Sequence, residues 1–422
     1  MESKINVCLM NDSFPPQIDG VANVVMNYAG IITRDYGSAT VVTPYCPGAE
    51  DDYPYRVVRY PSIATSLGYR AGLTLTPKEI RELAQKNFDV IHTHCPIVST
   101  FHARALRELT GKPVIFTYHT KFDVDIKNAI DLGFLQKAAI RAIVANIEAC
   151  DEVWTVSRGA GENLRSLGFT GKYEVVENGV DFPKGKASPD AVDAVSREYS
   201  LPDGVPLFLF VGRMMWYKGL RTILEGLSIA KRNGCVFRMI FAGGGGDEAE
   251  ARVLCDELGL SAECVFTGMV KDREKLRSLF SRADMFLFPS TFDTNGIVVR
   301  EAAACGLGSV LIRGSCAAEG MTDGRNAILI DDTPQSLAEA VEGICGGRIP
   351  AAMIGQRAME ELYRSWDEAV AEAVERYRES AERGARRTRP VTRLEEMAEE
   401  RKAVLESEWG VAMRKLREYS KK

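Results

Sequence analysis

The residues with the clearest chemical potential in this chain lie in the run FPSTFDTNGIVVREAAACG, residues 288–306. An apolar stretch ends in Pro-Ser, a polar loop carries Asp293, and a helix is expected to begin after Gly296 and to present Glu301. Glycine lets a backbone approach a ligand closely, and the free amides and dipole of a helix N-terminus attract negative charge. The run therefore predicts a site for an anionic ligand that carries hydroxyl groups.

Two cations occur earlier in the chain, in the run GRMMWYKG at residues 212–219. Arg213 and Lys218 follow the apolar run PLFLFV, which is expected to be a strand, and they flank a turn bounded by glycines. Isolated surface cations are common and need no ligand. Two cations at the carboxyl end of a strand suit a leaving group whose negative charge grows as a bond breaks. The two segments together predict a site for a nucleoside diphosphate that carries a sugar.

The spacing of Asp293 and Glu301 resembles the E-x7-E motif of the retaining glycosyltransferases of family 4, and GRMMWYKG resembles the G-R-x(4,5)-K-G phosphate clamp of that family. The resemblance covers roughly residues 5–380. Within it, NDSFPPQIDGVANVV, IHTHCP and TYHTKF look most like the branch that glucosylates diacylglycerol in bacterial membranes. The resemblance implies transfer of a hexose, with glucose expected, from a UDP-sugar to a hydroxyl acceptor such as diacylglycerol.

The resemblance also implies roles for three side chains. The family's second acid accepts hydrogen bonds from the nucleotide ribose, and Glu301 matches it; the first acid contacts the donor sugar, and Asp293 matches it with a side chain one methylene shorter than the usual Glu. His119, at the end of PVIFTY, matches a histidine that contacts the donor sugar and the transition state. The alternatives are a helix-stabilising acid, a turn-forming aspartate and a structural histidine.

Other contacts with the donor are expected to come from the backbone. Gly20, in PPQIDGVAN after the first strand, is expected to permit close approach, although it can also be an ordinary turn glycine. The run GGGG at 243–246 lacks the Gly-x-Gly-x-x-Gly spacing, and we expect a tight turn there. The resemblance assigns the remaining donor contacts to Gly212, Gly268, Met269, Val270, Asn295, Gly296 and Ile297.

The acceptor is expected to be held by the first half of the chain. His94 lies at the end of DVIHTH, and Lys121 and Lys127 lie in or near the segment 123–149, which mixes cations with apolar residues. That segment can be a core helix with solvated lysines, or an interfacial surface that receives a lipid at an anionic membrane. Both readings stay open.

In the resembled family, the acceptor attacks the face that the leaving diphosphate vacates. No protein nucleophile is demanded, and Arg213, Lys218 and the helix dipole stabilise the leaving group. We therefore expect transfer without a metal and without a cofactor.

Short apolar runs alternate with segments that can be helical, which is typical of parallel sheets covered by helices. The series runs from INVCLM to YEVVENG and restarts after FPKGKASPD with PLFLFVGR. The pattern predicts an α/β protein with two Rossmann-like, doubly wound domains that face a central cleft, which is the GT-B arrangement. The predicted parts are an acceptor domain at 1–182, a nucleotide-sugar domain at 183–364, a helix returning to the first domain at 365–382, and a charged helical tail at 383–422.

Composition excludes several classes of protein. The chain has 422 residues, 45% of them hydrophobic, and a net charge of −5, without a basic, aromatic-laced patch that would indicate nucleic-acid binding. The ten cysteines form no CxxC pair, which favours reduced thiols. The start of the chain lacks the apolar core of a signal peptide, and no apolar run is long enough to span a membrane. We expect a cytoplasmic protein, or a peripheral one on the inner face of the plasma membrane.

Three other functions remain open at this stage. A soluble glycosyltransferase for a polysaccharide or a small glycoside would need no lipid. A nucleotide-sugar isomerase would convert the UDP-sugar alone. A catalytically inactive binding protein is suggested by Asp293, by Ala327 where the family commonly has Gly and by Gly308 where it commonly has Pro. The oligomeric state is left open.

Overall fold

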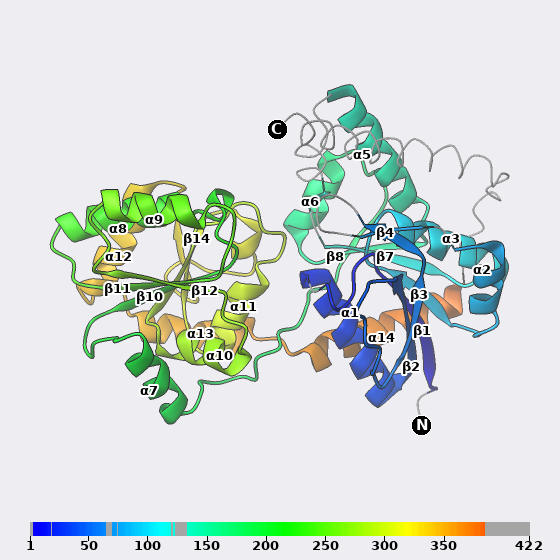
Figure 1. Cartoon of the computed structure of the whole chain (residues 1–422), viewed down its shortest axis with the longest axis horizontal. Helices are drawn as coiled ribbons and strands as arrows, with labels where there is room; N and C mark the ends of the chain where they lie inside the picture. Colours follow the sequence, from blue (N-terminus) through cyan, green and yellow to red (C-terminus); the bar gives the residue numbers. More distant parts are fainter. Residues whose placement is uncertain are drawn as a thin grey trace. The chain divides into compact units, whose positions relative to one another are not determined.

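The computed structural model describes residues 3–17, 19–64, 70–73, 75–119, 121–122 and 133–384. The chain divides into two compact units (Figure 1). The first unit comprises Met1–Glu177 and Trp366–Lys422, and the second comprises Asn178–Ser365. The chain therefore enters its second unit slightly before residue 182, and Trp366 and the helix that follows it belong to the first unit.

The first unit contains a seven-stranded sheet in the order β3-β2-β1-β6-β7-β8-β9. All of its strand pairs are parallel. The strands are β1 (Ile5–Met10), β2 (Gly37–Pro44), β3 (Arg56–Tyr60), β6 (Val90–Thr93), β7 (Val114–Tyr118), β8 (Glu152–Thr155) and β9 (Glu174–Val175). A separate antiparallel pair is formed by β4 (Ser62–Ala64) and β5 (Arg70–Gly72).

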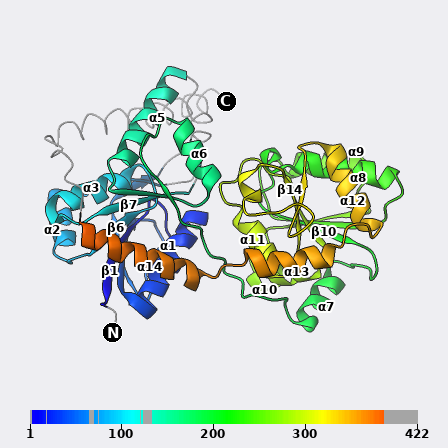
Figure 2. The ribbon, with the colours of Figure 1, turned by 180° about the vertical axis from the view of Figure 1, so that it is seen from behind.

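Helices cover both faces of this sheet. They are α1 (Gly20–Ile31), α2 (Pro77–Ala84), α3 (Val98–Thr110), α5 (Gly133–Glu148), α6 (Arg158–Ser166) and α14 (Trp366–Arg383). Because side chains alternate along a strand, Val7 and Leu9 of β1 pack with α1 and α14, whereas Cys8 and Met10 pack with α3 and α5. Figure 2 shows α14 lying along the first unit beside α1, although it is distant in sequence.

The second unit contains a six-stranded parallel sheet in the order β12-β11-β10-β13-β14-β15. The strands are β10 (Leu207–Val211), β11 (Arg238–Ala242), β12 (Cys264–Gly268), β13 (Met285–Phe288), β14 (Ser309–Ile312) and β15 (Ile328–Ile330). The helices are α7 (Pro189–Glu198), α8 (Leu220–Arg232), α9 (Glu248–Glu257), α10 (Arg273–Arg282), α11 (Ile297–Ala304), α12 (Pro334–Cys345) and α13 (Ala351–Leu362).

The predicted fold class is confirmed, because each unit is an α/β layer structure around a parallel sheet. The apolar runs of the two predicted series correspond to twelve of the fifteen strands found in the described residues, and they do not include β3, β4 and β5. The run RVVRY that forms β3 carries two arginines, Arg56 and Arg59, and is only partly buried at the sheet edge, so it lacks the continuous apolar signal of the central strands.

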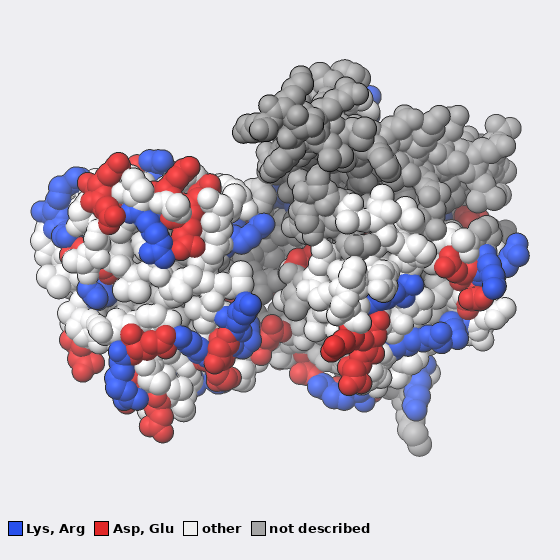
Figure 3. Space-filling model, viewed as in Figure 1, with Lys and Arg blue, Asp and Glu red and all other residues white. Residues whose placement is uncertain are grey.

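The described residues contain no helix that is long and apolar enough to cross a membrane. On the face drawn in Figure 3, basic and acidic side chains of the described residues are interspersed over both units. All ten cysteines are free thiols. Lys127 and the tail from residue 385 onward lie outside the described residues.

Candidate functional site

In the sheet of the second unit, the order in which the chain adds strands reverses between β10 and β13. From β10 the chain adds β11 and β12 on one side, and it then returns to place β13 on the other side of β10. In open parallel sheets, ligands bind outside the carboxyl ends of the strands at such a switch point. The loop 212–219 follows β10 and the loop 289–296 follows β13, so the topology brings both predicted loops to the same edge.

Lys218 and Asp293 connect these two loops directly. The Lys218 ammonium donates to Asp293 Oδ1 at 2.6 Å, and the Ser290 hydroxyl donates to Asp293 Oδ2 at 2.6 Å. Lys218 is only 9% exposed. Gly219 has φ +82°, and a Cβ there would lie 2.3 Å from the Pro289 carbonyl oxygen, so only glycine allows the loops to approach this closely. The predicted phosphate cation is thus paired with the predicted sugar-binding acid.

The helix that follows Asp293 begins as the sequence predicts. Gly296 is the N-cap of α11 and adopts φ +61°, where a Cβ would lie 2.9 Å from the Ala317 Cβ. Because a glycine cap has no side chain, Gly296 itself offers no side-chain oxygen to the first amides, which begin at Ile297. Asn295 is buried beside this turn. The geometry suits an anion at the helix start.

Glu301 lies further along α11 and is 8% exposed. Its Oε1 accepts a hydrogen bond from Arg273 Nη2 at 2.6 Å, and the same guanidinium is 3.5 Å from Asp181. Burial raises the pKa of Glu301 above its ordinary value, whereas the charge and hydrogen bond of Arg273 lower it. Arg273 was missed by the sequence analysis, because one arginine at the start of a helix carries no pattern that points to an acid on another helix.

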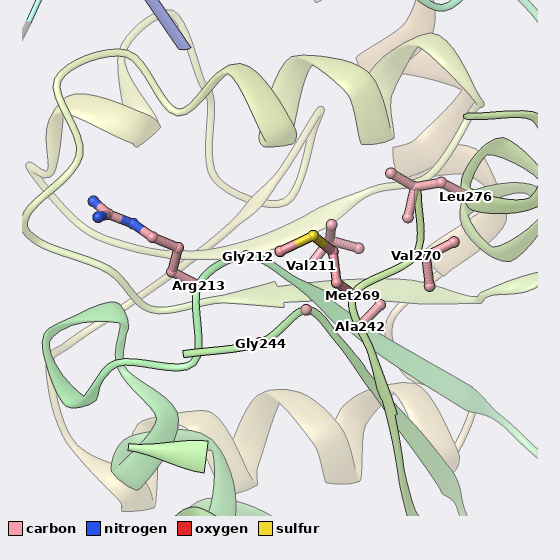
Figure 4. A pocket seen from close by; sticks show the side chains of 9 residues that line it. Val211, Gly212, Arg213, Ala242, Gly244, Met269, Val270 and Leu276 are labelled. Atoms are coloured by element: carbon pink, nitrogen blue, oxygen red, sulfur yellow. The ribbon is translucent and has the colours of Figure 1, made fainter. Parts of the chain in front are cut away.

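An open pocket of about 190 Å³ lies at the carboxyl ends of β10, β11 and β12. It brings together four predicted residues, Gly212, Arg213, Met269 and Val270, and Figure 4 shows the Arg213 side chain extending away from Val270 and Leu276. Gly268, the residue before Met269, has φ +68°. The remaining lining comes from Val211, Ala242, Gly243, Gly244 and Leu276. A largely apolar slot next to backbone groups suits a planar base.

The glycine run 243–246 packs directly against the 212–218 turn. A Cβ on Gly243 would lie 1.9 Å from the Gly212 carbonyl oxygen, and one on Gly245 would lie 2.3 Å from the Met214 carbonyl oxygen. The Met214 amide donates to the Gly244 carbonyl at 3.0 Å. The run is therefore a tight turn, as expected, and its lack of side chains lets the two loops pack backbone against backbone.

His94 and His119 form a buried pair in the first unit. His94 Nδ1 and His119 Nε2 are 2.9 Å apart at the ends of β6 and β7, and the two residues are 2% and 9% exposed. Burial lowers the pKa of His119 to about 3 and that of His94 well below its ordinary value, so both rings are neutral near pH 7. His94 Nε2 is buried and has no hydrogen-bond partner among the described residues.

The other predicted residues of the first unit are less informative. Gly20 is the first residue of α1, where the Asp19 side chain accepts from the Ala22 amide at 2.7 Å, and a Cβ on Gly20 would meet open space. Lys121 is half-buried. In the described part of the chain, no cluster of three or more His, Cys, Asp or Glu side chains could hold a metal ion.

In the comparison with known proteins, each half of the chain matches a family model. A family model described as Glycosyltransferase Family 4 matches residues 18–183, and one described as Glycosyl transferases group 1 matches residues 192–361. An alpha-maltose-1-phosphate synthase of Mycolicibacterium smegmatis is 26% identical over 402 residues, which cover 89% of this chain and 99% of that protein.

Two further similarities concern a relative and a solved structure. The GDP-mannose-dependent alpha-(1-6)-phosphatidylinositol monomannoside mannosyltransferase of M. smegmatis is 25% identical over 370 residues, 85% of this chain and 94% of that protein. The solved structure of Anabaena HepE in complex with UDP and glucose matches with a TM-score of 0.69 at 17% identity, over 89% of this chain and 100% of that chain.

The paired parallel-sheet units and their structural neighbours define a GT-B protein. With both family models matched in their expected order, the chain is a glycosyltransferase like those of family 4.

Proposed function

We propose that this protein moves a hexose, with glucose the expected sugar, from a UDP-sugar to a hydroxyl group of a membrane lipid such as diacylglycerol, with retention of configuration. The observation that carries the proposal is the arrangement at the edge of the second sheet. There Lys218 and Asp293 join two loops, Glu301 follows on α11, and the pocket beside Arg213 lies next to them in sequence and topology.

The proposed chemistry assigns a role to each group. The bond between the anomeric carbon and the UDP oxygen breaks, and the acceptor oxygen bonds to the same face of that carbon while its proton passes to the departing diphosphate. Arg213, Lys218 and the amides at the start of α11 stabilise the growing negative charge. His119, which is neutral, contacts the donor sugar. The two cations motivate the further proposal that no metal is required.

UDP as the carrier is supported by the pocket that Met269 and Val270 line, and by the structural likeness to a protein solved with UDP and glucose. A lipid acceptor is supported by the similarity to a mannosyltransferase whose acceptor is a phosphatidylinositol monomannoside. A peripheral position on the inner face of the membrane belongs to the same proposal.

A soluble acceptor is the second candidate. It is favoured by the similarity to the alpha-maltose-1-phosphate synthase, which spans nearly the whole length of that protein. In this case the enzyme would turn over without a membrane, and the half-buried Lys121 would contact a sugar or phosphate and not a lipid surface.

The test is UDP release from a panel of UDP-sugars, with and without anionic vesicles that contain diacylglycerol, and with soluble glycosides as alternative acceptors. We expect release that depends on the vesicles and is greatest with UDP-glucose, that persists in EDTA, and that Lys218→Ala abolishes. Release with soluble acceptors alone would select the second candidate. Conversion of a UDP-sugar without an acceptor would indicate an isomerase.

A further inference from the structure

Arg273 links three segments of the second unit around Glu301. It is the first residue of α10, and its guanidinium lies 2.6 Å from Glu301 of α11 and 3.5 Å from Asp181 of the segment that precedes α7. The same guanidinium lies over the Phe182 ring, 4.2 Å from its centroid. An arginine held by two acids and an aromatic face has a defined orientation, because the planar guanidinium stacks and donates in fixed directions.

Glu301 is the more deeply buried member of the Arg273–Glu301 pair. Its side chain is 11% exposed, whereas that of Arg273 is 46% exposed. A buried carboxylate is costly unless a cation or hydrogen-bond donors compensate its charge. Among the described residues, Arg273 is the group that donates to Glu301, and it does so to Oε1. Oε2 is left without a protein donor in that part of the chain.

We propose that Arg273 is a positioning residue for nucleotide recognition: it fixes the Glu301 carboxylate through Oε1, so that Oε2 is presented to the ribose hydroxyls of the donor. The inference rests on the proposed function, in which Glu301 contacts the ribose. It adds a residue from a different helix, one that the E-x7-E resemblance does not include.

The pH dependence follows from the charges that face Glu301. Arg273 favours its ionised form, whereas burial and the carboxylate of Asp181 disfavour it. The next titratable neighbour of Glu301 is the thiol of Cys305, the C-cap of α11, and Arg277 of α10 acts on that thiol. Without Arg273, burial and the Asp181 carboxylate are the effects that remain on Glu301, and both raise its pKa. The carboxylate would then be protonated, and the ribose contact weakened, at a higher pH than in the wild type.

The experiment is calorimetric titration of the full-length protein with UDP at about pH 8 and about pH 6. Arg273→Gln removes the charge, Arg273→Lys retains it, and Arg282→Gln is the matched control, because Arg282 closes the same helix and donates only to the Pro202 carbonyl among the described residues. UDP itself gains a proton near the lower pH, so the measured quantity is the ratio of each variant's Kd to the wild-type Kd at the same pH.

We expect Arg273→Gln to weaken UDP binding about threefold at the higher pH and about tenfold or more at the lower, since a charge-assisted hydrogen bond is lost as Glu301 protonates. Arg273→Lys should restore most of the pH profile, and Arg282→Gln should match the wild type. In a Glu301→Gln background, Arg273→Gln should add no pH dependence.

Two results overturn the inference while leaving the proposed function intact: a Kd for Arg273→Gln equal to the wild type, or a loss by the same factor at both pH values, which indicates a merely structural contact. Thermal melting of each variant identifies misfolding. If Arg273→Gln is misfolded, Arg273→Lys decides the question. A Kd ratio for Arg273→Lys that is the same at both pH values supports the inference, and a ratio that rises at the lower pH opposes it. A wild-type protein that binds no UDP overturns both the inference and the nucleotide of the proposed function.

Discussion

Lys218 and Asp293 show how one ion pair can organise a site before any ligand is present. Their side chains are 11% and 19% exposed, and Asp293 is also held by Ser290. The pair fixes the loop after β13 to the loop after β10, so it sets the distance between the predicted phosphate cation and the start of α11. A diphosphate that approaches Lys218 then shares its ammonium with an acid that is already in place.

The first prediction concerns this pair. Lys218→Ala leaves the Asp293 carboxylate poorly compensated, so we expect a loss of about 2 kcal/mol in unfolding free energy together with most of the turnover. Lys218→Met combined with Asp293→Asn should recover stability in urea denaturation without recovering UDP release. Equal stability of the single and double variants would contradict the structural role of the pair.

The second prediction concerns the histidines. The pKa of His119 is about 3 in the folded protein, against an ordinary value of 6.5, so between these values the unfolded chain binds a proton that the folded protein excludes. Unfolding free energy should therefore be unaffected above about pH 6.5 and should fall with acidification below it, by up to about 1.4 kcal/mol per pH unit for each such group. Urea denaturation across this range should show a shallower fall in His119→Gln. Parallel curves for the two proteins would exclude the effect.

At the scale of elements, glycines decide how closely the loops pack. Gly245 has no room for a Cβ, which would lie 2.3 Å from the Met214 carbonyl oxygen, whereas a Cβ on Gly246 would make an ordinary contact at 3.7 Å with Met215 Sδ. The two neighbours therefore form a matched pair in which chemistry and position in the chain are nearly constant and only the available space differs.

The third prediction uses that pair. Gly245→Ala should displace the 212–218 turn, weaken UDP binding at least tenfold and cost about 1–3 kcal/mol of stability, because overpacking against backbone cannot be relieved by a rotamer change. Gly246→Ala should stay within about 0.5 kcal/mol of the wild type, as surface substitutions usually do. Similar losses in both variants, measured by calorimetry and urea denaturation, would argue against the packing of the two loops.

At the scale of the whole molecule, the first unit is assembled from two distant parts of the chain. Trp366, Val370 and Tyr377 of α14 belong to the core formed around β1 and α1. The Tyr377 hydroxyl lies 2.5 Å from His92 Nδ1, and its ring stacks on Trp154 with centroids 5.4 Å apart. Folding of the first unit therefore requires residues that follow the whole second unit.

The fourth prediction follows from this connectivity. A chain that ends at Ser365 exposes one face of the first sheet, so its first unit should unfold at a markedly lower temperature while the second unit still binds UDP. Tyr377→Phe keeps α14 and removes one buried hydrogen bond, and it should cost about 1 kcal/mol. Calorimetric scans that show no change in the truncated chain would contradict a structural role for α14.

Much of the fold could be predicted from the sequence because the central strands are continuous apolar runs between turn residues, as in Leu207–Val211 and Met285–Phe288. A strand that is buried on both faces has a nearly continuous apolar sequence, whichever strands it pairs with. The edge strand β3 does not, since it is only partly covered. For the site, the sequence indicated Lys218, Asp293 and Glu301, because their spacing within the segments 212–219 and 288–306 is local information.

The tertiary structure alone decided which of these groups meet. The sequence determined two parallel-sheet α/β units, the glycine-bounded loops after β10 and β13, and the residue types that could hold an anionic ligand with hydroxyl groups. It did not determine that Lys218 lies against Asp293, that Arg273 lies against Glu301, or that His94 lies against His119. Each pair joins segments with at least one other strand or helix between them in the chain. Contacts of this kind depend on strand order and loop packing, which no local pattern of residues records.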